Sequence, residues 1–275
     1  MARRSGLRWV LLAAVFSVAG AVAADKETIT VIGTGDLGDS FGARLAALGY
    51  PVIYGSRFPD GDKAQGVVKA TGHGATVTNN REAAQQGDIV ILAIPWPPMR
   101  QVATSLGDLS GKIVIDPSLP YIQGEDGYPD SQALPSSAEL IQEWNPGAKV
   151  VKGIGTMGSM ILDDPSTVDG PITIPLASDH RDAKERAAEI AAELGFDPVD
   201  LGPLRMGRYI EALQLIYMIP LLQRRDEEFE FYFRRSADWV CQWQDDWSKP
   251  VYDADALAVM PETQSPLRSC RDRGF

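Results

Sequence analysis

Short, almost uninterrupted apolar runs recur along the first two thirds of the chain. The clearest is DIVILAIP, at residues 88–95. Parallel strands that are buried on both faces have this continuous apolar character, whereas a strand with one wet face alternates apolar and polar residues. The pattern predicts strands at residues 28–32, 52–54, 88–95, 112–116, 150–152 and 171–176.

Amphipathic helical patterns alternate with these strands. Phe41, Leu45 and Leu48 recur at the spacing of one helix face, and residues 99–106 and 183–194 show similar stripes. Strands and helices that alternate through short connections are typical of an α/β fold. We therefore predict a doubly wound parallel sheet.

The pattern changes near Leu204. Residues 204–247 predict one long helix, or two helices that break at Pro220, because proline lacks the backbone N–H that an inner helical turn needs. The chain beyond Trp247 is polar and rich in proline, and predicts no element. We therefore divide the chain into a signal segment (1–24), a nucleotide-binding domain (25–203) and a helical carboxyl-terminal region with a polar tail (204–275).

The first 24 residues have the layout of a secretory signal peptide. Arg3, Arg4 and Arg8 precede an uncharged stretch at residues 9–24, which is shorter than the roughly 20 residues of a membrane-spanning helix. We expect export, to the periplasm or the extracellular space, with an uncleaved amino-terminal anchor as the alternative to cleavage. The pair Arg3-Arg4 partly matches a twin-arginine signal.

The charge balance and the cysteines restrict the partners. Removing the three signal arginines leaves 23 basic against 37 acidic residues, a net charge of −14. Such a surface repels nucleic acid and anionic lipid, and no later stretch is long and apolar enough to span a membrane. Cys241 and Cys270 form no C-x-x-C pair, so we expect no metal site, and we predict a disulfide between them in an oxidising compartment.

A glycine-rich motif of the form G-x-G-x-x-G joins the first predicted strand to the first predicted helix. In that context Gly33 permits a tight turn, Gly35 leaves room for a pyrophosphate, and Gly38 lets the helix pack on the strand. The amino end of the helix adds free N–H groups and the positive end of its dipole. The motif predicts a Rossmann dinucleotide site at Gly33, Thr34, Gly35, Asp36, Leu37 and Gly38.

The end of the second predicted strand indicates which dinucleotide binds. An NAD-binding protein places Asp or Glu there to accept the ribose hydroxyls, but this chain has Ser56 and Arg57, and no acid before Asp60. A serine hydroxyl and a guanidinium bind a 2′-phosphate, which a carboxylate would repel. Lys63 adds a second charge nearby, and Thr34 lies within reach of the same phosphate. The sequence therefore favours NADP over NAD.

Four motifs in register, IGTGDLG, GSR, DIVILAIPW and VVKGIGTMGSMILDDP, resemble the NADP oxidoreductases that use coenzyme F420, and the related domain of the STEAP ferric reductases. The resemblance covers residues 28–222. It implies nucleotide contacts at Thr34, Gly35, Asp36 and Leu37, 2′-phosphate contacts at Ser56 and Arg57, a wall along the ribose and nicotinamide at Ala93, Ile94 and Pro95, and a place near the nicotinamide for Gly153 and Ile154.

In such enzymes hydride passes directly between two stacked rings, so positioning does the catalytic work and we assign no catalytic residue. We expect an exported NADP(H)-dependent oxidoreductase with a flavin-like or deazaflavin acceptor, which enters near the loop around Met157 and Met160. The alternatives are a non-catalytic NADP-binding sensor or interaction protein on the same fold, and an NADPH-dependent imine, carbonyl or ferric reductase. The sequence leaves open whether the protein is a homodimer.

Overall fold

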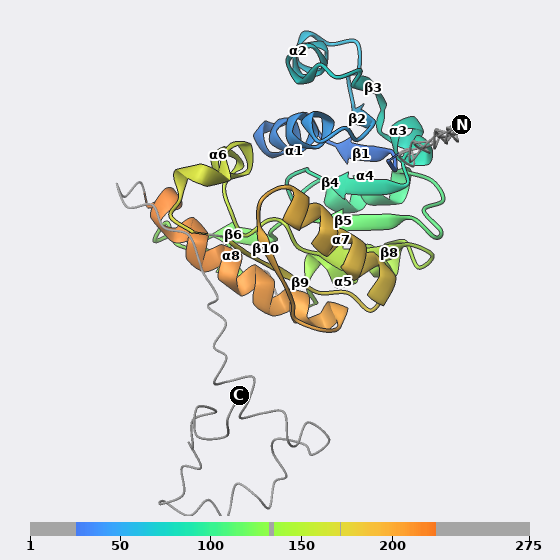
Figure 1. The fold of residues 1–275 in the computed structure, drawn as a ribbon. Helices are drawn as coiled ribbons and strands as arrows, with labels where there is room; N and C mark the ends of the chain where they lie inside the picture. The colour runs from blue at the N-terminus through green and yellow to red at the C-terminus, as the bar shows by residue number, and fades with distance from the viewer. Residues whose placement is uncertain (1–25, 132–134, 171, 224–275) are drawn as a thin grey trace, which may run out of the picture.

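The computed structural model describes residues 26–131, 135–170 and 172–223. Its centre is a six-stranded parallel sheet in the order β3-β2-β1-β4-β5-β8 (Figure 1). This is the strand order of the Rossmann fold. Strands β2 and β3 are added on one side of β1, and the chain then crosses to add β4, β5 and β8 on its other side. The prediction of a doubly wound parallel sheet is confirmed. The strands are β1 (Ile29–Ile32), β2 (Val52–Ser56), β3 (Thr76–Asn79), β4 (Ile89–Leu92), β5 (Ile113–Asp116) and β8 (Lys149–Lys152).

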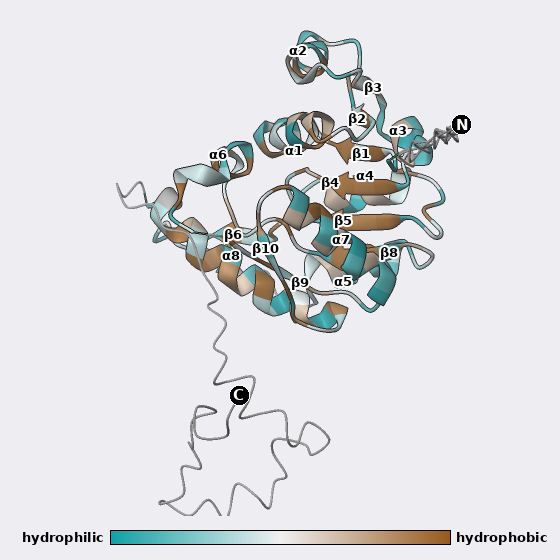
Figure 2. Ribbon diagram, viewed as in Figure 1, coloured by the Kyte–Doolittle hydropathy of each residue, from teal (hydrophilic) through white to brown (hydrophobic). Residues whose placement is uncertain are grey.

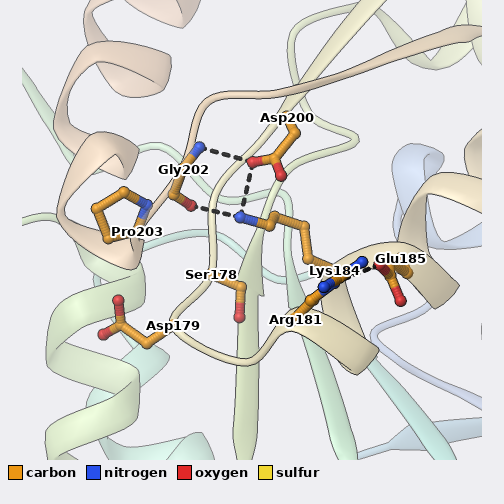
Figure 3. A pocket seen from close by; sticks show the side chains of 8 residues that line it. All are labelled: Ser178, Asp179, Arg181, Lys184, Glu185, Asp200, Gly202 and Pro203. Carbon is orange, nitrogen blue, oxygen red and sulfur yellow. Dashed lines mark hydrogen bonds and ion pairs between the residues drawn. The ribbon is translucent and has the colours of Figure 1, made fainter. Parts of the chain in front are cut away.

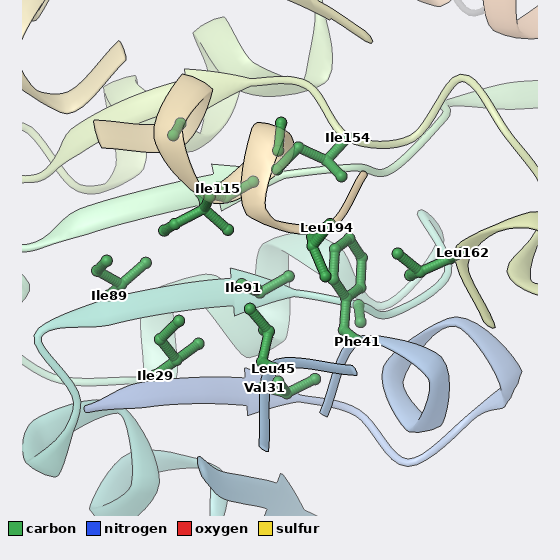
Figure 4. Close-up of a cluster of buried hydrophobic side chains, with 14 of the residues drawn as sticks. Ile29, Val31, Phe41, Leu45, Ile89, Ile91, Ile115, Ile154, Leu162 and Leu194 are labelled. Atoms are coloured by element: carbon green, nitrogen blue, oxygen red, sulfur yellow. The ribbon is translucent and has the colours of Figure 1, made fainter. Parts of the chain in front are cut away.

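Helices cover both faces of the sheet. Successive strand residues point to opposite faces, so Ile89 and Ile91 join one apolar cluster, drawn in Figure 4, while Val90 and Leu92 join the other. The first cluster includes residues of α1 (Asp36–Ala47) and α7 (Arg181–Glu193); the second includes residues of α3 (Asn80–Gln86), α4 (Met99–Ser105) and α5 (Ser137–Trp144). Burial on both faces explains the continuous apolar runs, which colour β1, β4 and β5 brown in Figure 2.

Smaller elements complete the described part of the molecule. β9 (Thr173–Leu176) and β10 (Asp197–Asp200) form a parallel pair, which an isolated bridge between Lys152 and Ala177 joins to β8. The hairpin of β6 (Tyr121–Gln123) and β7 (Pro129–Ser131) packs against α8 (Gly207–Leu222). The remaining elements are α2 (Asp62–Thr71), α6 (Ser159–Asp163), and the short 3-10 turns at Pro165–Thr167 and Leu204–Met206.

The structure corrects several predicted boundaries. The strand predicted at residues 88–95 is only β4, because β1, its partner in the sheet, ends opposite Leu92 and turns away at Gly33. The strands β3, β6, β7 and β10 were not predicted, since none of them is a buried apolar run; β10, for example, reads DPVD. Helix α8 contains Pro220 and runs to Leu222. The rest of the predicted helical pattern, residues 224–247, lies outside the described residues.

Several predictions fall on parts of the chain that lie outside the described residues. They are the signal segment with its Arg3-Arg4 pair, the disulfide between Cys241 and Cys270, and the polar tail. These features, and the domain boundaries that depend on them, stay predictions. Among the residues that the structure describes, no helix combines the length and the apolar character needed to cross a bilayer.

Candidate dinucleotide site

The glycine-rich loop follows β1 at the carboxyl edge of the sheet. Gly33 has a φ of +119°, a conformation that L side chains rarely adopt, and a Cβ there would overlap the carbonyl oxygen of Ala93. A Cβ on Gly38 would overlap the carbonyl oxygen of Gly33. The protein itself therefore requires glycine at these two positions. A Cβ on Gly35 would meet nothing within 4 Å, so the structure leaves free the place where a pyrophosphate would approach.

The amino end of α1 is open to an anion. Its N-cap is Gly35, and no side chain caps the helix. The first free N–H groups of this 12-residue helix therefore face outward, with the positive end of the dipole behind them. Thr34 and Leu37 are half-buried and Asp36 is exposed. The loop thus has the geometry of a phosphate cradle.

The predicted 2′-phosphate residues lie at the end of β2. Ser56 is the last residue of that strand, and its Oγ accepts a hydrogen bond of 3.1 Å from the backbone N–H of Phe58. Arg57 is exposed, with its guanidinium 6.0 Å from the centre of the Phe58 ring. Lys63 is exposed in the first turn of α2. Neither cation forms an ion pair with any described residue, so both charges remain available to an anion.

The residues that follow β4 lie next to the glycine-rich loop at the carboxyl edge of the sheet. Ala93 is 8% exposed and lies beneath the glycine-rich loop, as its contact with Gly33 shows. Ile94 is half-buried and Pro95 is exposed. Of these three predicted residues, Pro95 presents the most open surface to a ligand.

Gly153 and Ile154 follow β8 and are both buried. The N–H of Gly153 donates to the carbonyl oxygen of Asp116 at 3.1 Å, and Ile154 has no exposed surface. Ile154 also has a φ of +53°, an outlier for a β-branched residue, which costs about 1–3 kcal/mol. The turn that this conformation makes leaves Gly155 half-exposed, followed by the buried Met157 and the exposed Met160. Gly155, which sequence reasoning did not select, is thus more accessible than the predicted Gly153 and Ile154, although a Cβ there would overlap the carbonyl oxygen of Pro117.

A buried charge cluster lies directly before that loop. The Lys152 Nζ is 3.1 Å from Asp116 Oδ2, 3.3 Å from Glu211 Oε1 and 2.8 Å from Ser137 Oγ. It also donates to the carbonyl oxygen of Ser118. The Lys152 and Asp116 side chains are fully buried, and that of Glu211 is 5% exposed. The cluster joins the ends of β5 and β8 to α5 and α8.

Ser137 lies between the two carboxyl groups of this cluster. The Ser137 Oγ is 2.5 Å from Asp116 Oδ2 and 2.6 Å from Glu211 Oε1, but a hydroxyl has only one hydrogen to donate. Burial raises the pKa of Glu211, and the nearby Lys152 ammonium opposes that shift.

These four polar residues were missed by sequence reasoning. Each belongs to a different element, and no motif connects them. One signal was present: Asp116 and Lys152 each end a run of otherwise apolar residues, at the carboxyl end of a buried strand. Such a charge must be paired, because an isolated buried charge is too costly.

A hollow of about 500 Å³ lies elsewhere, at the carboxyl ends of β9 and β10 (Figure 3). Its charged residues are already bonded to one another or to the backbone. Lys184 pairs with Asp200 at 2.6 Å, Arg181 with Glu185 at 2.7 Å, and Asp179 accepts from a backbone N–H. We therefore do not place the nucleotide there. Across the described segments, no group of three or more His, Cys, Asp or Glu side chains is arranged to hold a metal ion.

Comparison with known proteins identifies the family of the chain. A family model described as NADP oxidoreductase coenzyme F420-dependent matches residues 28–120. The F420-dependent NADP reductase of Methanocaldococcus jannaschii is 30% identical over 195 residues, which cover 66% of this chain and 86% of the relative. A putative F420-dependent NADP reductase from Arthrobacter sp. FB24 superposes with a TM-score of 0.65 at 26% identity, covering 70% of this chain and 92% of that chain.

The human metalloreductase STEAP2 is 33% identical over 196 residues, which cover 70% of this chain but only 36% of STEAP2. The chain thus spans little more than a third of the STEAP relatives that it matches. The likeness to the methanogen reductase extends over most of that protein's length. The chain therefore belongs to the coenzyme F420-dependent NADP oxidoreductase family, which confirms the predicted family and the prediction of NADP as its nucleotide.

Proposed function

We propose that the protein transfers hydride between NADP(H) and a flavin-like or deazaflavin ring. The observation that carries this proposal is the open cradle at Gly35, together with the unpaired Arg57 and Lys63 beside it. A dinucleotide with a 2′-phosphate complements this combination of free backbone N–H groups and free cations. The names of the methanogen relatives, F420-dependent NADP reductases, support a deazaflavin as acceptor.

The polar groups at the other end of the edge support direct hydride transfer. Glu211 lies behind the loop of residues 153–158, and its side chain is only 5% exposed, so its carboxyl is poorly placed to give a proton to a substrate. Reduction of an imine or carbonyl needs a proton donor at the substrate. Hydride transfer between two stacked rings needs only their placement.

Anaerobic oxidation of NADPH tests the proposal. The purified protein is mixed with NADPH and, in separate reactions, a deazaflavin, free flavin, a quinone, a ferric chelate and a cyclic imine. We expect turnover with the deazaflavin or flavin. Turnover with the imine alone would overturn the assigned acceptor class. Binding of NADPH without turnover by any acceptor would favour the sensor alternative, and turnover by the ferric chelate alone would favour a metal reductase.

We further propose that residues 1–24 direct export and that the Arg3-Arg4 pair selects the twin-arginine route, which carries folded cargo. Export of a folded protein would bring its bound NADP across the membrane. Replacing both arginines with lysine is expected to retain the precursor inside, as fractionation of the cells would show. Unchanged export of that variant would contradict the twin-arginine route.

A further inference from the structure

We expect the nicotinamide half of the cofactor to lie over the carboxyl ends of β4 and β5. A Rossmann sheet binds a dinucleotide across its switch point, one half on each side. Ser56 and Arg57 place the adenosine half beside β2, so the other half extends past β4 toward β5 and β8. The half-exposed Gly155 and Gly158 lie in the loop that follows β8, which we call the β8 loop (residues 153–158).

The β8 loop contains the strained Ile154, and such a conformation persists only where its surroundings fix it. Two sets of contacts fix this conformation, one on the residue two positions before Ile154 and one on the residue after it. Before it, Lys152 is held in the buried cluster, where Glu211 Oε1 is 3.3 Å from its ammonium. After it, the carbonyl oxygen of Gly155 accepts a hydrogen bond of 2.7 Å from Gln214 Nε2.

Both sets of contacts involve side chains from one face of α8. Glu211 and Gln214 are three residues apart, a spacing that brings helical side chains together. Gln214 Nε2 also donates to the carbonyl oxygen of Pro117 at 3.0 Å, and so ties the β8 loop to the loop after β5. The two carbonyl acceptors fix the orientation of the amide, although this leaves the buried Gln214 Oε1 without a partner among the described residues.

We propose that Gln214 and Glu211 are positioning residues, which fix the β8 loop as the support on which the nicotinamide ring is aligned for hydride transfer. The inference rests on the proposed function. Its physical basis is that hydride transfer depends steeply on geometry, so a misplacement of about 1 Å costs roughly 100-fold in rate. Neither residue needs to touch the cofactor for this effect.

Gln214→Met is the test variant, because methionine has a similar length but donates no hydrogen bond. Glu211→Gln is the conservative variant, since an amide oxygen in place of Glu211 Oε1 still accepts from the N–H and the Oγ of Ser137. Arg208→Gln is the matched control. Arg208 also lies on α8, but it bonds to Glu139 of α5 at 2.7 and 2.8 Å, away from the β8 loop. Arg208→Gln removes this contact between α8 and α5 and leaves the hydrogen bonds of Gly155 and Lys152 in place.

The measurements are the rate of hydride transfer in a single turnover and the dissociation constants of NADPH and of 2′,5′-ADP, which has no nicotinamide. For Gln214→Met we expect a rate about 10- to 100-fold lower, weaker NADPH binding and unchanged 2′,5′-ADP binding. Arg208→Gln should keep the wild-type values, and Glu211→Gln, which keeps the hydrogen bonds of Ser137 but not the charge beside Lys152, should lose less than Gln214→Met. Equal losses for both ligands, or the same loss in Arg208→Gln, would overturn the proposal and leave α8 a role in stability alone.

The two binding constants also separate this inference from the proposed function. If no acceptor oxidises NADPH, the proposed reaction fails, but the ratio of the NADPH and 2′,5′-ADP constants still reports whether α8 positions the nicotinamide half. If turnover is found and Gln214→Met leaves both the rate and that ratio unchanged, the proposed function stands and the positioning role is wrong.

Discussion

At the β1–β2 end of the carboxyl edge, the cations assigned to the nucleotide are exposed and have no ion pair among the described residues. At the β5–β8 end, the polar residues are buried and bonded to one another. Gly35 has clear space around it and Arg57 has no ion pair among the described residues. Lys152, by contrast, has a carboxylate, a hydroxyl and a carbonyl oxygen as partners. The described residues thus supply few partners to the groups at the first end, whereas they supply several to the groups at the second.

The difference indicates two roles along one edge. An open end gains most of its interactions when the nucleotide binds, so changes there should alter affinity and leave folding intact. A closed end contributes to folding and holds the backbone in place, so changes there should alter stability and geometry. The following predictions test that division.

The largest expected effect is on stability at the closed end. Lys152→Met removes the ammonium and leaves Asp116 as a buried, unpaired carboxylate, so we expect a loss of about 3–5 kcal/mol in the free energy of unfolding. Lys149→Met is the matched control on the same strand, because the Lys149–Asp182 pair is partly exposed and is worth at most about 1 kcal/mol. Urea unfolding measures both. Equal losses would contradict the account of the buried cluster.

At the open end, Gly35→Val should abolish most nucleotide binding and spare the fold. A Cβ at this position meets no protein atom, but a branched side chain would occupy the space of the pyrophosphate. Losing two charge-assisted hydrogen bonds, at about 1.5–3 kcal/mol each, weakens NADP and NAD alike by roughly 100-fold or more. Calorimetric titration gives the affinities, and the unfolding midpoint should stay near the wild-type value. A variant that unfolds would place Gly35 with the structural glycines.

Arg57→Ala should separate the two nucleotides. One charge-assisted bond to the 2′-phosphate is worth about 1.5–3 kcal/mol, so NADP should bind roughly 10- to 150-fold more weakly. NAD has no phosphate at that position and should bind as before. Equal weakening of both nucleotides, measured by the same titration, would show that Arg57 does not read the 2′-phosphate.

The smallest expected effect is the pH dependence at the closed end. Burial raises the pKa of Glu211 above its ordinary value of 4.5. The stability that its protonated form gives is therefore complete below pH 4.5, and is lost as the pH rises through the native pKa. Subtracting the unfolding free energy of Glu211→Gln at each pH isolates this slope, since the other carboxylates titrate in both proteins. A difference that does not change with pH would show that folding does not raise the pKa of Glu211.

The open end could be predicted from the sequence, because its residues are local. The six positions from Gly33 to Gly38 form a short loop and the start of α1, and Ser56 and Arg57 lie at the end of β2. The closed end could not be predicted, since the fold brings together residues as distant as Ser137 and Glu211, which are 74 positions apart. Strands β3 and β10 were not predicted because each lies at the edge of its sheet and contains no continuous run of buried apolar residues.

The most direct test of the central claim is the affinity of the unmodified protein for NADP and for NAD, measured by calorimetric titration under the same conditions. The account predicts that NADP binds at least about 10-fold more tightly, because the free guanidinium of Arg57 has a phosphate to bind in NADP and none in NAD. Equal affinities, or a preference for NAD, would contradict the assignment of Ser56 and Arg57. If neither nucleotide binds, the fold serves something other than nicotinamide redox chemistry.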